Sequence, residues 1–130
     1  MKQEDKELLL QDLCARLPYG VHCCVLNLNK TIKEDNDIIY GILGDNIVTL
    51  KSDKNECYMH YQVKPYLRPM SSMTEEELKE FSVLGVGIHL FKGPLIPSYD
   101  TLDWLNKHHF DYRGLIPKGL AIEPPSDMYT

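Results

Sequence analysis

Basic residues are scarce in this 130-residue chain, and no apolar run is long enough to cross a membrane. The 14 Lys and Arg are outnumbered by 19 Asp and Glu, giving a formal net charge of −5 at pH 7. General phosphate-binding surfaces need clustered Lys and Arg, so this balance disfavours a nucleic-acid partner without excluding it. The most apolar stretch, FSVLGVGIHLF, is about half the length of a membrane span. We therefore expect no membrane association.

Cysteines are few and irregularly spaced. Cys14, Cys57 and the adjacent pair Cys23 and Cys24 fit neither a secreted disulfide framework nor the paired C-x-x-C knuckles of a zinc ribbon. The first residues, MKQEDKELLLQDLCARL, place acids on both sides of three leucines and lack the apolar core of a secretory signal. These features predict reduced thiols and a cytoplasmic location.

Catalytic signatures are also missing. The chain has no G-x-S-x-G elbow, no phosphate-cradling glycine loop and no H-E-x-x-H pair. His108, His109 and Asp111 would suit a general base with an orienting carboxylate, but no nucleophile accompanies them. We expect no catalytic residue and no cofactor, although a metal-dependent or hydrolytic enzyme stays open as an alternative.

One zinc site can be drawn from the sequence. His22 and Cys24 share a face of a predicted strand, and His60 on a neighbouring strand would supply a third ligand. This spacing matches no known ligand pattern. We favour the interpretation that a cysteine of the Cys23–Cys24 pair packs as a small apolar residue while the histidines lie at the sheet edge.

An N-terminal helix and two or three short C-terminal helices are predicted within a single domain of residues 1–130. Leucines 10, 13 and 17 recur at helical spacing over residues 2–17, and PYG at 18–20 ends that helix. In MTEEEL, Thr74 can cap a helix, and the side chain of Glu77 can reach back to Thr74. Leu78 begins the buried stripe of this helix. A third helix, capped by Ser98 or Asp100, carries His109 on its buried face.

The remaining segments predict a small antiparallel sheet. VHCCVLNL (21–28) is apolar on both faces, and IIYGIL and IVTLK flank a GDN turn at 44–46. CYMHYQVKPYL (57–67) alternates as a strand, whereas NKTIKEDND (29–37) is predicted to be a polar loop and EPPSDMYT (123–130) a frayed end. The fold class is therefore α+β, with a curled sheet that can close into an SH3-like barrel.

Two stretches carry a resemblance: VKPYLRPMSSMTEEEL (63–78) and WLNKHHFDYRGLIPKGLA (104–121). Together they make up about a quarter of the chain, and they resemble a family of short uncharacterised proteins from gut bacteria and their phages or mobile elements. That family has no known activity, so no site residue follows from it. The resemblance implies a small accessory protein of a mobile element that acts in the host cytoplasm.

The second stretch, residues 104–121, is predicted to be structural. Its DYRG and PKG turns would carry Phe110, Leu115, Ile116 and Leu120 inward, and the tail would cover an edge of the sheet.

The leading functional hypothesis is a non-enzymatic accessory protein that binds another protein through a surface including Arg68, Tyr112 and Arg113. Arg68 lies between two prolines and either offers its fork to a partner's carboxylate or pairs within the chain. The alternative is a nucleic-acid accessory protein that uses the curled sheet and a basic patch of Lys64, Arg68, Arg113 and Lys118. Partner identity and oligomeric state stay open.

Overall fold

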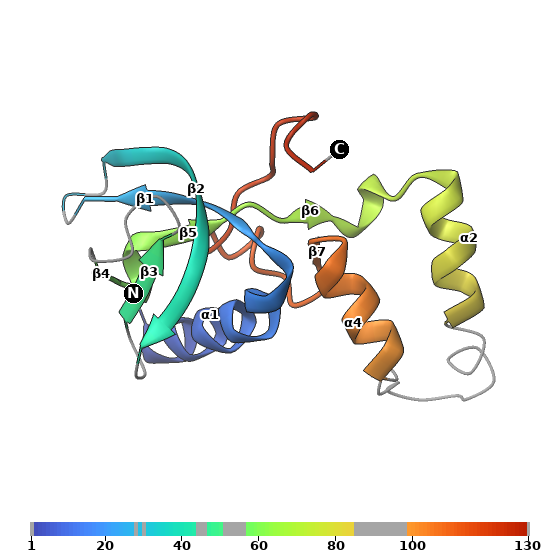
Figure 1. Cartoon of the computed structure of the whole chain (residues 1–130), viewed down its shortest axis with the longest axis horizontal. Helices are drawn as coiled ribbons and strands as arrows, with labels where there is room; N and C mark the ends of the chain where they lie inside the picture. The colour runs from blue at the N-terminus through green and yellow to red at the C-terminus, as the bar shows by residue number, and fades with distance from the viewer. Residues whose placement is uncertain are drawn as a thin grey trace.

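The computed structural model describes residues 2–27, 29, 31–43, 47–50, 57–84 and 99–129. An N-terminal helix, α1 (Gln3–Arg16), precedes a curled antiparallel sheet, and two short helices, α2 (Glu75–Leu84) and α4 (Tyr99–Lys107), lie to one side of it (Figure 1). This is the α+β fold that the sequence predicts. The predicted GDN turn and the connector between α2 and α4 lie outside the described residues.

The main sheet contains five strands: β1 (His22–Leu26), β2 (Ile32–Leu43), β3 (Ile47–Leu50), β4 (Cys57–Met59) and β5 (Val63–Pro65). They lie in the order β4-β3-β2-β1-β5. The long strand β2 pairs with β1 along its first part and with β3 along its second, so the sheet curls into a half-barrel (Figure 1). A 3₁₀ turn, η2 (His60–Gln62), connects the edge strands β4 and β5.

Two strand predictions were wrong in detail. The predicted polar loop, residues 29–37, instead forms the first half of β2 from Ile32 onward. Lys33, Asp35 and Asn36 are exposed, since the outer face of a curled antiparallel sheet meets water, whereas Asp37 is buried. The predicted strand 57–67 is broken by η2, where Gln62 replaces ladder bonds: its amide oxygen accepts from the Met59 N–H and its amide nitrogen donates to the Leu26 carbonyl.

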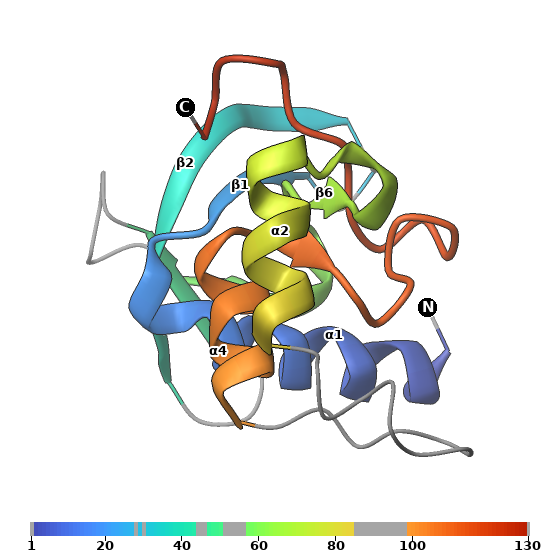
Figure 2. The same ribbon diagram turned by 90° about the vertical axis from the view of Figure 1, so that its right-hand side faces the viewer.

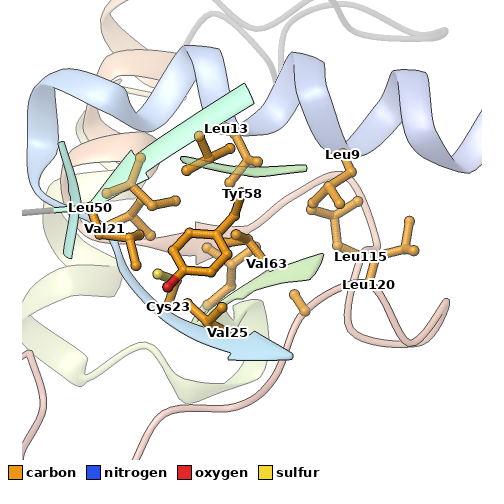
Figure 3. Close-up of a cluster of buried hydrophobic side chains, with 14 residues drawn as sticks. Leu9, Leu13, Val21, Cys23, Val25, Leu50, Tyr58, Val63, Leu115 and Leu120 are labelled. Carbon is orange, nitrogen blue, oxygen red and sulfur yellow. The ribbon is translucent and has the colours of Figure 1, made fainter. Parts of the chain in front are cut away.

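The core lies between α1 and the inner face of the half-barrel (Figure 3). Burying these aliphatic groups supplies the main driving force for the fold, at about 25 cal/mol per Å² of apolar surface. The fully buried members come from α1, the sheet and the C-terminal tail: Leu9, Leu13, Val21, Cys23, Val25, Val48, Val63, Leu67 and Leu115.

The buried face of α1 differs from the leucine stripe predicted at positions 10, 13 and 17. The buried residues are Leu9, Asp12, Leu13 and Arg16, and the two charged ones are fully shielded from solvent. Asp12 and Arg16 are one helical turn apart and form an ion pair, with Arg16 Nε donating to Asp12 Oδ2 at 2.8 Å. Pairing lets this face of the helix bury charge.

Helices α2 and α4 lie side by side next to the half-barrel (Figure 2). Trp104 of α4 joins them, because its ring lies 5.6 Å from that of Phe81 and its Nε1 donates to Glu80. Leu78 does not begin a buried stripe, since it is 54% exposed. His109 is not on a face of α4, because the helix ends at Lys107 and His109 has a positive φ of 64°.

The tail after α4 runs back along the sheet. β6 (Arg68–Pro69) pairs in parallel with β7 (Phe110–Asp111), and the Ile122 amide donates to the Pro65 carbonyl beside β5. The predicted covering of a sheet edge by this tail is therefore confirmed. The predicted frayed end is wrong, because the Tyr129 hydroxyl donates to the Tyr66 carbonyl and accepts from the His22 N–H.

Candidate functional site

Arg68 pairs within its own chain. Its guanidinium donates to both oxygens of Glu77, at 2.7 and 2.6 Å, and lies 4.2 Å from the centre of the Phe110 ring. Glu77 also completes the predicted capping box, accepting from the Thr74 N–H while its own N–H donates to Thr74 Oγ1. These bonds, the one from Arg68 above all, lower the pKa of Glu77 from 4.5 to about 2. The guanidinium of Arg68 is therefore paired within the chain rather than offered to a partner's carboxylate.

Arg113 and Tyr112 join the tail to α1. Arg113 Nε lies 3.2 Å from Asp12 Oδ1, and its terminal nitrogen donates to the Tyr112 hydroxyl. That hydroxyl in turn donates to Asn106. Arg16 adds a bond of 2.6 Å from its guanidinium to the Phe110 carbonyl. Two of the three residues of the hypothesised partner surface, Tyr112 and Arg113, therefore belong to a network that holds the tail in place.

Asp111 does not take the orienting role that the sequence suggested for it beside the two histidines, and His108 Nδ1 instead lies 3.6 Å from Glu77 Oε2. Asp111 accepts hydrogen bonds from the backbone amides of Leu115 and Ile116, so its carboxylate caps a turn. His109 stacks on Tyr129 with ring centres 3.9 Å apart. Burial, together with neighbouring cations, lowers the pKa of His109 to about 4. Above this pH His109 is neutral, and its contact with the Tyr129 ring is one of packing.

The hypothesised zinc ligands have other surroundings. His22 Nδ1 lies 2.8 Å from Asn36 Oδ1, and burial raises the pKa of the Cys24 thiol. The side chain of His60 lies outside the described residues. No group of three potential ligands comes together in the part of the chain that the structure describes. All four cysteines are free thiols, with Cys14 and Cys57 exposed.

Two of the predicted basic residues, Lys64 of β5 and Lys118 of the tail, line one groove. Its volume is about 630 Å³. We call it the lysine groove and define it by Leu26, Ile32, Tyr61, Lys64, Lys118 and Ile122.

The lysine groove combines free charge with exposed apolar surface. Within the described residues, neither Lys64 nor Lys118 forms an ion pair, whereas Arg68 and Arg113 both do. Ile32 is 62% exposed at the rim. Asp5, at the start of α1, adds one carboxylate to the lining. Since buried apolar contacts and complementary charge are the ingredients of a protein interface, this groove is the candidate site.

A second hollow, of about 470 Å³, lies between Arg68 and the C-terminal residues. Several of its polar groups are engaged within the chain: Arg68 binds Glu77, Ser72 Oγ donates to the Pro69 carbonyl, and the Tyr129 hydroxyl makes two bonds. A ligand there would have to displace these partners, which makes it the poorer site.

No protein-family model, curated protein or solved structure matches the chain. None of the helices in the described ranges is both long and apolar enough to cross a membrane.

Ile32 is the groove residue that sequence reasoning missed, because it lay inside a predicted polar loop. One signal was available. Ile32 is a β-branched residue that pairs across the β1–β2 ladder with Leu26, and both line the groove. Counting these two apolar positions as a cross-strand pair would have extended the hairpin over the polar run.

Proposed function

We propose that this chain is a non-enzymatic accessory protein of a phage or mobile element that binds another protein in the host cytoplasm through the lysine groove. The mobile-element context and compartment come from the resemblance of residues 63–78 and 104–121. The binding role is carried by one observation: two lysines that form no ion pair with any described residue line the same groove as the exposed aliphatic side chain of Ile32. The lysine groove therefore replaces the surface of Arg68, Tyr112 and Arg113 as the proposed partner surface.

Nucleic acid is the less favoured occupant. Of the four residues in the hypothesised basic patch, Arg68 and Arg113 are paired with carboxylates, which leaves Lys64 and Lys118. Binding to phosphates usually needs a longer series of cations. The ring of Tyr61 is not an open stacking platform either, because Lys6 Nζ lies 5.0 Å from its centre.

Affinity capture from the native host tests the proposal. The wild-type chain is compared with Ile32→Ser, which removes the exposed aliphatic group from the groove. Leu78→Ser is the matched control, because Leu78 is a similarly exposed aliphatic residue on α2, outside the groove. We expect a specific partner that is lost with Ile32→Ser and retained with Leu78→Ser. Equal capture by both variants, or no specific partner, contradicts the proposal.

Reversing the charge of Arg113 is not a useful binding test. Arg113→Glu would place a second carboxylate against Asp12, which is fully buried. Two adjacent carboxylates of this kind destabilise the folded state, so any lost binding would report on folding.

A further inference from the structure

We infer that the lysine groove recognises a short acidic peptide segment of its partner, in which carboxylates alternate with aliphatic side chains. This inference rests on the proposed protein-binding function and specifies the chemistry of the occupant. It follows from the juxtaposition of Lys64 and Lys118 with Ile32 and Ile122 in one groove.

Charge favours an acidic occupant. The chain carries a net charge of −5, yet among the described lining residues of the groove the two lysines outnumber one carboxylate, Asp5. Lys6 adds a further positive charge nearby, over the Tyr61 ring. An acidic segment would meet a local excess of positive charge here, while the acidic remainder of the surface would repel it. This arrangement fixes where such a segment binds and makes its association dependent on salt.

The apolar lining requires aliphatic side chains in the same segment. Leu26, Ile32, Leu120 and Ile122 contribute carbon surface to the groove. A peptide that carried only carboxylates would leave Ile32 exposed to water and gain little from exposed ion pairs. The volume of about 630 Å³ falls in the range that holds a drug-sized ligand, which corresponds to a few residues of peptide.

Binding of synthetic peptides to the purified full chain tests this inference. Three fluorescein-labelled probes of equal length are compared by fluorescence anisotropy: glutamate alternating with leucine, glutamine alternating with leucine, and glutamate alternating with serine. We expect the glutamate–leucine probe to bind about tenfold or more tightly than either of the others, and its affinity to fall as salt rises.

Charge reversal of the two groove lysines tests whether the glutamate–leucine probe binds in the groove. The double variant Lys64→Glu, Lys118→Glu should lose the glutamate–leucine probe and gain binding to a lysine–leucine probe. The control double variant Lys79→Glu, Lys107→Glu changes the net charge equally at exposed lysines of α2 and α4. This control variant should still prefer the glutamate–leucine probe to the lysine–leucine probe, as the wild type does. Circular dichroism of both variants establishes that they are folded.

Three results would overturn the inference. The first is equal binding of the glutamate–leucine and glutamine–leucine probes. The second is loss of the probe with the α2 and α4 lysines instead of Lys64 and Lys118. The third is tighter binding of a single-stranded oligonucleotide in the groove than of any peptide.

The two proposals fail separately. A captured partner that is lost with Ile32→Ser but retained with the Lys64 and Lys118 reversals upholds protein binding and refutes the acidic segment. Tight binding of the glutamate–leucine probe without any captured partner refutes the proposed function alone.

Discussion

Glu77 offers a sharp test of how the helix pair is attached to the half-barrel. Its carboxylate joins Arg68 of β6 to the N-terminus of α2, and it is 15% exposed. A fall in pKa from 4.5 to about 2 corresponds to about 3 kcal/mol of folded-state stability at neutral pH. Partial solvent screening reduces this to about 2 kcal/mol. Glu77→Gln should therefore cost about 2 kcal/mol at pH 7.

The pH dependence has a defined sign. Because the folded-state pKa lies below the unfolded value, the stabilisation is complete above about pH 5 and is lost as pH falls towards 2. The difference in unfolding free energy between wild type and Glu77→Gln should therefore be full at pH 7 and shrink steadily below pH 5. Urea unfolding at each pH measures this difference. The fluorescence of Trp104, the single tryptophan, reports on it from the contact between α2 and α4.

Glutamine at position 77 is an informative replacement, because its amide oxygen can still accept from the Thr74 N–H in the capping box. Thr74→Ala is the control: it removes the capping hydroxyl and leaves the Arg68 ion pair, and should cost about 1 kcal/mol with little dependence on pH. A Glu77→Gln penalty that stays constant between pH 7 and pH 3 would refute the assignment of the stability to the ion pair.

Other predictions concern the tail and the thiols. Asp12→Ala leaves Arg16 buried without its partner and should cost about 3–5 kcal/mol in urea unfolding, whereas Glu7→Ala on the exposed side of α1 should be near neutral. Tyr129→Phe removes two hydrogen bonds and should cost about 1–3 kcal/mol, with faster hydrogen exchange at the His22 amide. A thiol reagent should modify two cysteines at once and the other two only in denaturant. In an NMR titration, His109 should change protonation near pH 4.

The local signals of the sequence predicted the helices well. The capping box at Thr74 and Glu77 forms as expected, since both of its bonds lie within one turn. The first helix ends where PYG predicts, and Gly20 adopts a φ of 65°. Features that satisfy backbone groups within a few residues depend little on the rest of the chain, which is why the sequence discloses them.

Contacts between residues far apart in sequence determine the features that local signals did not predict. The polar run after Ile32 has no strand periodicity, yet it forms β2 because β1 supplies a ladder partner. The charged face of α1 is buried because Arg113 and Phe110, about a hundred residues away, meet Asp12 and Arg16. Spacing within one helix cannot predict a partner so distant in sequence.

The same physical reason separates the candidate site from the predicted one. All four basic residues of the hypothesised patch looked equivalent in sequence, but a guanidinium pairs readily with a carboxylate. Arg68 binds both oxygens of Glu77, and Arg113 Nε lies 3.2 Å from Asp12 Oδ1. The two lysines, with a compact and strongly hydrated charge, stayed at the surface beside an apolar groove. The tail of the molecule is thus a structural element held by Arg16 and Arg113, and the proposed partner surface is the groove that carries the two lysines.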